Sequence, residues 1–169
     1  RFDWTAVDLA EAKAVKSRLG GTLNDVLLAV VSGALRAYLR RRRVNVDILD
    51  FIATIPVNIR IPGDQEGGHK VTGWFAPLQV SERDPICRLE RVRATTKALK
   101  EQAHTHPTVH LFKLAEVGGP PALGAVVTLA QSLNPANLIV TNVPGPPFPL
   151  FILGSRMTAG YPLVTLRAN

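Results

Sequence analysis

The chain has 169 residues, 46% of them hydrophobic, which is the ordinary globular range and favours one domain, 1–169. A single cysteine, Cys87, excludes an internal disulfide framework and favours a reducing cytosol, and the apolar stretch 26–35 is far shorter than the roughly 20 residues that cross a bilayer. Lysine and arginine outnumber aspartate and glutamate by 20 to 13, and the net charge of +7 favours polyanionic partners such as nucleic acid, anionic lipid or a phosphorylated cofactor.

A short helix is predicted at the amino-terminal end. Asp8 followed three residues later by Glu11 resembles a capping box, which places the helix start there. Two glycines at 20–21 supply a flexible stop. The segment 8–19 is therefore predicted to be a short amphipathic helix.

A second helix, 22–39, is predicted to follow at once. The Thr22 hydroxyl can accept a hydrogen bond from the backbone N–H of residue 25, and the Asp25 carboxylate favours the positive end of the helix dipole. Apolar residues cover most of the circumference of this segment. We therefore expect a central helix that other elements surround.

Two strands are predicted next. The segment 48–60 is rich in β-branched and aromatic residues and nearly continuously apolar, which favours a strand buried on both faces. Pro56 removes one ladder donor, so the strand should be at an edge or bulged there. Glycine-rich 61–73 is predicted to be a loop, and 74–80 the next strand.

A third helix is predicted from Asp84-Pro85 to about residue 103, with Asp84 as cap and Pro85 in the first turn. Cys87 is expected to be a small buried or half-buried residue of this helix. The predicted inner stripe consists of Ile86, Leu89, Val92 and Leu99. The outer face is basic and fits either a solvated face or a contact with CoA phosphates or anionic lipid; it consists of Arg88, Arg91, Arg93, Lys97 and Lys100.

The carboxyl-terminal part is predicted to contain helical pieces at 108–117 and 120–133, a strand at 137–143, a proline turn, and a strand at 149–157. The apolar residues of this last region and of the strand at 74–80 fit a core or domain interface better than an acyl-chain channel; they are Trp74, Phe75, Phe148, Leu150, Phe151 and Ile152. Because helices and strands interleave and some strands are adjacent, the order predicts an α/β two-layer sandwich with a mixed sheet.

Catalytic and metal motifs of the common kinds are missing from the sequence. His104, His106 and His110 cluster around a proline, which favours a surface turn over a metal site. No G-x-S-x-G elbow, P-loop or G-x-G-x-x-G is present. We therefore expect no metal and no bound cofactor.

The densest positive charge is the run 40–43, which contains four arginines. Cations complement the negative end of a helix dipole, so a helix end with a solvated face explains the run without a partner. A lipid surface or the phosphates of CoA is the sharper alternative. Nucleic acid is the weakest one, because neither an aromatic platform nor a nucleic-acid-binding fold motif accompanies the charge.

Four segments together carry a family resemblance. They are TLNDVLLAVVSGALRAYL (22–39), FIATIPVNIR (51–60), DPICRLERVRATTKALK (84–100) and NLIVTNVPGPPFPLFILG (137–154). In this order they resemble the carboxyl-terminal half of the bacterial wax ester synthase/diacylglycerol acyltransferase family, over nearly the whole chain. The pair Asn24-Asp25 and the segment T-N-V-P-G-P are the specific signals.

The resemblance implies one half of a two-domain, chloramphenicol-acetyltransferase-like fold. The family's catalytic H-H-x-x-x-D-G motif belongs to the amino-terminal half and is absent from this sequence. The family's last strands, expected beyond 161–162, also look lost or replaced. Residues 1–4 show neither a signal-like leader nor an initiator methionine, so we expect the chain to start inside a larger protein. A fragment whose partner half supplies the histidine is preferred over an inactive remnant.

The mechanism that the resemblance implies is transfer of a fatty acyl group from acyl-CoA, as substrate, to diacylglycerol or a long-chain alcohol. A histidine of the missing half would act as general base, and attack on the thioester would create an oxyanion. Thr141 matches the position from which a serine or threonine of the wider superfamily donates a hydrogen bond to that oxyanion. The neighbouring prolines would hold the strand exit rigid. A strand threonine bonded to neighbouring backbone is the plainer alternative.

Further site residues are assigned on the same resemblance. Asn24 and Asp25 are expected either to cap their helix or to support the active site, with Asn24 facing the channel. Residues assigned to substrate binding are Asn142, Pro144, Gly145, Arg40 and Arg43.

Two readings of the function remain open. The first is an acyl-CoA-dependent O-acyltransferase portion, cytoplasmic and peripherally associated with membrane or lipid droplets. The second is a non-catalytic lipid-binding or regulatory module derived from the same family. A partner chain that bears the H-H-x-x-x-D-G motif would favour the first.

Overall fold

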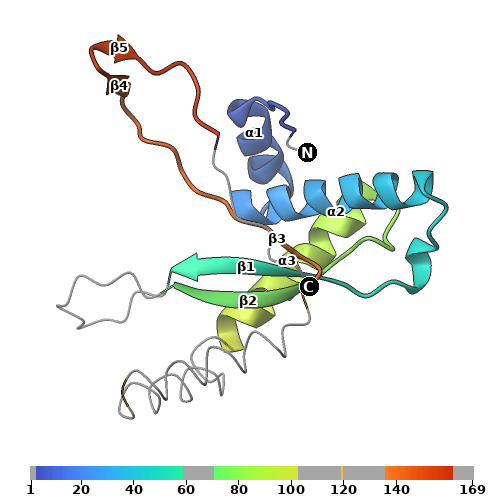
Figure 1. Cartoon of the computed structure of the whole chain (residues 1–169). Coiled ribbons are helices and arrows are strands. Elements are labelled where there is room, and N and C mark those ends of the chain that lie inside the picture. The colour runs from blue at the N-terminus through green and yellow to red at the C-terminus, as the bar shows by residue number, and fades with distance from the viewer. Residues whose placement is uncertain (1–2, 59–70, 103–118, 120–135, 162–169) are drawn as a thin grey trace.

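A computed structural model describes residues 3–58, 71–102, 119 and 136–161. Figure 1 shows two long helices crossing beside a small sheet, with an extended segment that leaves the sheet, turns in a hairpin and runs back. The elements in chain order are α1 (Leu9–Leu19), α2 (Leu23–Arg41), the 3₁₀ turn η1 (Val46–Ile48), β1 (Phe51–Asn58), β2 (Val71–Leu78), α3 (Pro85–Gln102), β3 (Leu138–Ile139), β4 (Phe151–Ile152) and β5 (Ser155–Arg156).

The main sheet is mixed. Its strand order is β2-β1-β3, with β1 antiparallel to β2 and parallel to β3. Helices α2 and α3 lie on one face of this sheet (Figure 1), and their side chains share one hydrophobic core with it. The predicted α/β two-layer sandwich with a mixed sheet is therefore confirmed.

The core lies between the two long helices and that face of the sheet. Strand β1 contributes Ala53 and Ile55, which are buried, whereas Thr54 is half-buried and Pro56 is exposed. The expectation that this strand is buried on both faces is wrong, because α2 and α3 cover the sheet from one side. Other members of the core are Val26, Leu28, Ala29, Ala76, Leu78, Val80, Leu89 and Val92.

Pro56 is accommodated because its side of β1 is unpaired in the described part of the chain. Along a strand, successive residues direct their backbone groups to alternate sides. The carbonyls of Ile52 and Thr54 accept hydrogen bonds from the β3 segment, so the nitrogen of Pro56 also faces that side. The β3 pairing reaches only Thr54, and the prediction of an edge at Pro56 is confirmed.

Helix α2 begins as predicted and is buried on one face only. Leu28 and Ser32 are almost fully buried, and the Ser32 hydroxyl donates to the Leu28 carbonyl at 2.7 Å. On the other side Val30 is 58% exposed and Tyr38 is 51% exposed, so the prediction of a helix surrounded on all sides is wrong. The apolar residues of that side have no cover in the described part of the chain.

Helix α1 forms close to the predicted bounds. The Asp8 carboxylate accepts from the backbone N–H of Ala10 at 2.6 Å, and Gly20 ends the helix. No residue of α1 is buried. Among the described helices none alone is long and apolar enough to cross a membrane; α1 and α2 reach that length and composition only as a pair bent by 104°.

Helix α3 begins at the predicted cap. The Asp84 carboxylate accepts from the backbone N–H groups of Ile86 and Cys87 at 2.9 and 2.8 Å. Ile86 is 50% exposed and Cys87 is exposed as well, so both burial predictions are wrong. They follow the cap on the outer side of the first turn, and the buried stripe is built from Leu89, Val92 and Thr96.

Two buried arginines fasten the β2–α3 connection to the helices. Arg36 of α2 is 6% exposed and donates to the carbonyls of Val80 and Ser81 at 2.8 and 2.9 Å. Arg88 of α3 donates to the carbonyls of Glu82 and Arg83. The predicted solvated basic face is therefore wrong for Arg88, whose charge satisfies backbone oxygens inside the fold.

The carboxyl-terminal segment differs from the two predicted strands. Only Leu138 and Ile139 pair as a strand in the first, and the second is a two-stranded hairpin, β4–β5. Leu153 and Gly154 form its turn with φ values of 50° and 81°, and two consecutive positive φ angles are the geometry of a tight hairpin turn. The predicted strand 149–157 therefore folds back on itself.

Several predicted features lie outside the described residues. They are most of the loop 61–73, the helical pieces 108–117 and 120–133, and the histidine cluster at 104–110. Strand β2 takes in Val71, Thr72 and Gly73, which the prediction gave to the loop.

Replacing Arg36 tests the hydrogen bonds that join α2 to the β2–α3 connection. In Arg36→Met, two carbonyls lose their charged donor inside the fold, and we expect the free energy of unfolding to fall by about 3 kcal/mol. Urea unfolding followed by circular dichroism measures this change. Arg41→Met, at an exposed position of the same helix, is the matched control and should change stability by less than about 0.5 kcal/mol. Equal effects of the two substitutions would contradict this stabilising role of Arg36.

Candidate functional site

The first turn of α2 is closed by a reciprocal capping box. The backbone N–H of Asp25 donates to the Thr22 hydroxyl at 3.2 Å, and the backbone N–H of Thr22 donates to the Asp25 carboxylate at 2.7 Å. The Thr22 hydroxyl donates to the same carboxylate oxygen at 2.8 Å. The predicted capping role is therefore confirmed for the carboxylate of Asp25.

The same carboxylate also joins α2 to α3. Its second oxygen accepts from the Thr96 hydroxyl at 2.7 Å, and both residues are buried. Burial raises the pKa of Asp25, but the hydrogen bonds from Thr96 and Thr22 and the charge of Lys100 outweigh it and hold the pKa below its ordinary value of 3.8. Asp25 is thus ionised at neutral pH with both oxygens engaged.

The side chain of Asn24, unlike that of Asp25, takes no part in the capping box or in the link to α3. Asn24 is half-buried, and its amide makes no hydrogen bond to another described residue. Capping in the structure is done by Thr22 and Asp25. The prediction that Asn24 faces a channel stays a prediction, and its amide is available for such a contact.

A groove of about 410 Å³ lies between the start of α2 and the middle of α3. Asp25 and Thr96 form part of its wall, and Arg93, Lys97 and Lys100 make the α3 side positive. Asn24 does not line it. The predicted solvated basic face of α3 therefore borders a concave surface at these three residues.

Arg93 also holds the α1–α2 junction. Its guanidinium donates to the Leu19 carbonyl at 2.8 Å and lies against both glycines of the junction. Gly21 has a φ of 91°, and a Cβ there would lie 2.9 Å from Cδ of Arg93. The junction therefore requires glycine both for its conformation and for the close approach of Arg93.

Thr141 lies just beyond β3 and is exposed. The chain before it is held to β1 by Asn137: the backbone N–H of Asn137 donates to the Ile52 carbonyl, and the backbone N–H of Ile52 donates to the side-chain oxygen of Asn137, both at 2.8 Å. The backbone N–H of Val140 donates to the Thr54 carbonyl at 2.9 Å. Three hydrogen bonds thus define where Thr141 leaves the sheet.

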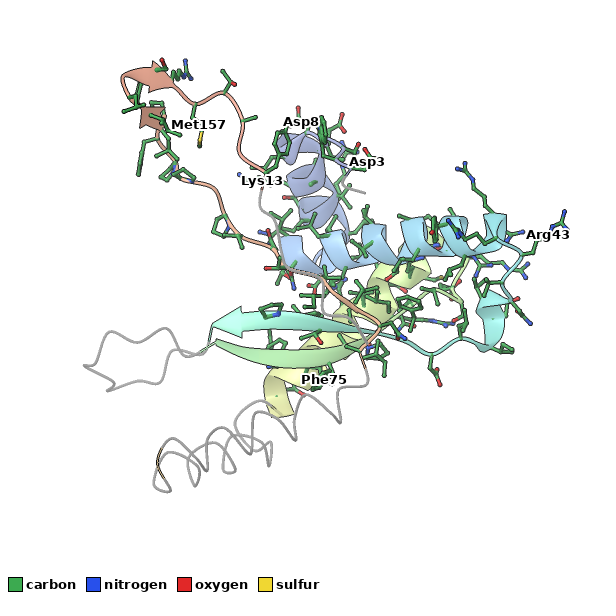
Figure 2. The ribbon with its side chains drawn as sticks, viewed as in Figure 1. Asp3, Asp8, Lys13, Arg43, Phe75 and Met157 are labelled. Carbon is green, nitrogen blue, oxygen red and sulfur yellow. The ribbon has the colours of Figure 1, made fainter. Side chains whose placement is uncertain are left out.

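The segment that begins at Thr141, residues 141–161, is an extended arm (Figure 1). Asn142, Pro144 and Gly145 are exposed in it, and a Cβ at Gly145 would meet nothing within 4 Å. Figure 2 shows Met157 on the returning part of the arm, to one side of the end of α1 that carries Asp8. The predicted substrate-binding residues of this segment therefore lie together on an open surface.

The tip of the arm, the β4–β5 hairpin, is apolar and exposed. Leu153 is completely exposed, and Phe148, Phe151 and Ile152 are each exposed by about three-fifths. These residues do not belong to the hydrophobic core that the described part of the chain forms. An isolated two-stranded hairpin is at best marginally stable in water, so this tip needs a covering surface.

Arg40 and Arg43 lie at the opposite end of α2 from Asn24 and Asp25. The helix has 19 residues and is therefore about 28 Å long. Figure 2 shows Arg43 at the end of α2 that points away from α1. Both arginines are exposed. The structure thus does not bring the predicted basic residues and the Asn24-Asp25 pair into one subsite.

Metal-binding geometry is not found in the described part of the chain, where no three histidine, cysteine or acidic side chains converge. The histidines that the sequence singles out lie beyond that part.

Two residues that organise the site were missed by sequence reasoning. Thr96 is 71 positions from Asp25, and a threonine inside a helix carries no local sign of such a partner. Asn137 opens the NLIVTN segment, where a polar side chain directly before an apolar strand is the one signal that could have pointed to an anchoring role.

Comparison with known proteins gives consistent matches. The family model of the WS/DGAT C-terminal domain matches residues 67–169. A Mycobacterium tuberculosis protein provisionally named a diacylglycerol O-acyltransferase is 33% identical over 171 residues, covering 98% of this chain and 34% of its own length. The O-acyltransferase WSD of Acinetobacter baylyi is 33% identical over 163 residues, covering 96% of this chain and 35% of its own length.

A solved structure shares the fold. The wax ester synthase/diacylglycerol acyltransferase of Marinobacter aquaeolei VT8 superposes with a TM-score of 0.60 at 24% identity, over 89% of this chain and 33% of that protein. This likeness confirms the α/β fold expected from the sequence. The chain spans about a third of the length of each of these relatives.

Removing the Asp25 carboxylate tests the link between α2 and α3. In Asp25→Ala the backbone N–H of Thr22 loses its carboxylate acceptor, so half of the capping box is removed, and the buried Thr96 hydroxyl loses its 2.7 Å acceptor on α2. We therefore expect the free energy of unfolding at pH 7 to fall by about 2 kcal/mol. Asp50→Ala, which removes an exposed carboxylate, is the control and should be nearly neutral.

The same pair of proteins gives a pH dependence of known sign. Since the pKa of Asp25 is lowered in the folded state, its stabilisation is complete above its ordinary value of 3.8 and disappears as the pH falls through the lower folded pKa. The stability difference between the parent protein and Asp25→Ala should therefore shrink below about pH 4. Chemical unfolding at a series of pH values measures it, and a difference that grows with acid would refute the assignment.

Proposed function

Because the chain belongs to the wax ester synthase/diacylglycerol acyltransferase family and matches its C-terminal domain, we propose that it is the carboxyl-terminal portion of an acyl-CoA-dependent O-acyltransferase. The names of its relatives in Mycobacterium tuberculosis, Acinetobacter baylyi and Marinobacter aquaeolei support this class of activity. They also support the acceptors we propose, diacylglycerol or a long-chain alcohol. Acyl-CoA is the proposed donor substrate, and no cofactor is required.

The observation that carries the proposal is the position of Thr141. Its side chain is exposed at the exit of β3, where β1 anchors the chain on one side and prolines follow on the other. Proline fixes φ and removes a donor, so the backbone after Thr141 has few conformations to choose from. A hydroxyl held in this way can donate to a developing negative charge at little entropic cost.

The reaction proceeds by direct transfer. The acceptor hydroxyl attacks the thioester carbonyl carbon, and its proton passes to a general base. The carbonyl oxygen becomes an oxyanion, to which the Thr141 hydroxyl donates a hydrogen bond. The C–S bond then breaks, the carbonyl re-forms as an ester, and the base returns the proton to the CoA thiolate. Asn142, Pro144 and Gly145 border the reacting groups.

The general base comes from another part of the enzyme. The sequence contains no H-H-x-x-x-D-G motif, and the relatives are about three times as long as this chain. We therefore assign the histidine to an amino-terminal lobe, present either in the same polypeptide or as a partner chain. That lobe also supplies the cover that the exposed apolar hairpin at Phe151, Ile152 and Leu153 needs.

Replacing the hydroxyl of Thr141 tests its role. In Thr141→Val, shape is retained and the donor is lost, and we expect kcat of the complete enzyme to fall by about 100-fold or more with little change in KM. Thr141→Ser restores a hydroxyl and should recover most of the activity. Initial rates with a long-chain acyl-CoA and an alcohol acceptor measure both.

The matched control is Thr158→Val, at another exposed threonine of the same arm. It should leave kcat unchanged. A Thr141→Val enzyme with full turnover, or a Thr158→Val enzyme that is equally impaired, would remove the proposed role.

Asn24 is tested by separating activity from stability. Since Thr22 and Asp25 form the cap, Asn24→Ala should leave the melting temperature nearly unchanged. If the Asn24 amide orients groups across the lobe interface, the specific activity of the complete enzyme falls. Normal activity with a clearly lower melting temperature would instead assign Asn24 to the stability of the helix start.

A further inference from the structure

The carboxyl-terminal end of α2 forms an exposed cationic corner. All four arginines of the run 40–43 are exposed, and the guanidinium of Arg42 lies 4.5 Å above the ring of Tyr38. The dipole of a single helix end needs no more than partial compensation and acts within the last turn. Four adjacent cations therefore exceed what the helix end itself requires.

Arg43 occupies a position where glycine is the ordinary residue. Its φ is 60°, its N–H donates to the Arg40 carbonyl at 2.9 Å, and the N–H of Val44 donates to the Leu39 carbonyl at 3.1 Å. These two bonds define a Schellman motif with a left-handed residue after the cap. A side chain with a Cβ is strained in this conformation, so the helix end carries its fourth arginine against the local backbone preference.

Apolar side chains are exposed beside the arginines. Ile48 is 79% exposed, Tyr38 is 51% exposed and Val44 is 38% exposed. Ile48 belongs to η1, which packs against the end of α2 (Figure 1). Cations and uncovered apolar groups therefore share one corner of the fold, which consists of residues 38–48.

Acidic groups do not cancel this charge. Asp47 is held between Arg36 and Arg83, with N–O distances of 3.5 and 3.6 Å, so its carboxylate already faces two further cations. Arg83 is itself 78% exposed at the same corner and adds to the positive surface.

We propose that this corner, residues 38–48 with Arg83, docks the protein onto the surface of an anionic phospholipid bilayer. Arginines bind the lipid phosphates, and Ile48, Tyr38 and Val44 enter the headgroup region, as in other surfaces that combine cations with apolar groups. This inference does not depend on the acyl-transfer proposal.

The two other anionic ligands fit the corner less well. A CoA phosphate site is concave and buries most of its ligand, whereas the groove in the described part of the chain lies at the other end of α2. Binding of single-stranded nucleic acid uses several aromatic platforms for the bases, and residues 38–48 contain a single aromatic side chain, Tyr38, with Arg42 over one ring face. An anionic bilayer needs neither a pocket nor a stacking platform.

Vesicle binding by the complete protein tests the proposal. The triple variant Arg40→Gln, Arg41→Gln and Arg43→Gln keeps Arg42 on Tyr38 and lowers the charge by three. We expect its partitioning onto vesicles of equal parts phosphatidylglycerol and phosphatidylcholine to be about 100-fold weaker, at about fivefold per arginine near an anionic surface. Co-sedimentation measures it. Binding of the parent protein should weaken with salt and vanish on pure phosphatidylcholine.

The matched control removes the same charge elsewhere. Lys13, Lys16 and Arg18 are exposed on α1, and Figure 2 shows Lys13 far from Arg43. Changing these three to glutamine should leave vesicle binding nearly unchanged. Equal losses in both triple variants would show a general charge effect and overturn the proposal.

Two single substitutions separate lipid docking from stability. Arg43→Gly should raise the melting temperature, because glycine accepts the left-handed conformation, and yet weaken vesicle binding about fivefold. Ile48→Ser should weaken binding at all salt concentrations. Intact vesicle binding in the Arg40, Arg41 and Arg43 variant overturns the proposal, and a selective rise in its KM for acyl-CoA would then assign the corner to CoA. Binding of random oligonucleotides in place of vesicles also overturns it.

Discussion

The pairing of β1 with β3 is the constraint on which the rest of the site depends. It rests on two residue pairs and on Asn137, whose backbone and side chain both bond to Ile52. This short ladder fixes the point at which the chain leaves the sheet, and Thr141 follows directly. The body of the domain behind it is held by buried polar contacts, Arg36 to the β2–α3 connection and Asp25 to Thr96. A rigid body and a short ladder thus define the position of an exposed hydroxyl.

The apolar surface that remains uncovered is informative because of its distribution. It gathers on the hairpin around Leu153, on the outer side of α2 at Val30, and on the side of the sheet that carries Phe75, which is 40% exposed and labelled in Figure 2. Large contiguous apolar patches are rare on free monomers, so these exposed apolar residues are consistent with the proposed contact with an amino-terminal lobe. The chain spans about a third of the length of its relatives, and the proposed second lobe would account for both observations.

Local chemistry decided which features could be predicted from the sequence. The starts of α2 and α3 were predictable because Thr22, Asp25 and Asp84 act within three residues of themselves. Burial was harder to predict, since periodicity shows which residues are apolar but does not show which elements cover them. The exposure of Val30 and Ile86 was missed for this reason. The hairpin was missed because Leu-Gly lacks the Asn or Asp that usually marks such a turn. Family resemblance, rather than periodicity, supplied Thr141.

The most direct test of the central claim is the reactivity of a thiol at the tip of the arm in the complete enzyme. Leu153→Cys, combined with Cys87→Ser to remove the native exposed thiol, places one cysteine on the hairpin. If another lobe covers the arm and completes the site, this cysteine reacts with a thiol reagent many times more slowly than a cysteine placed at exposed Asp50. Equal rates at the two positions in a fully active enzyme would contradict the account.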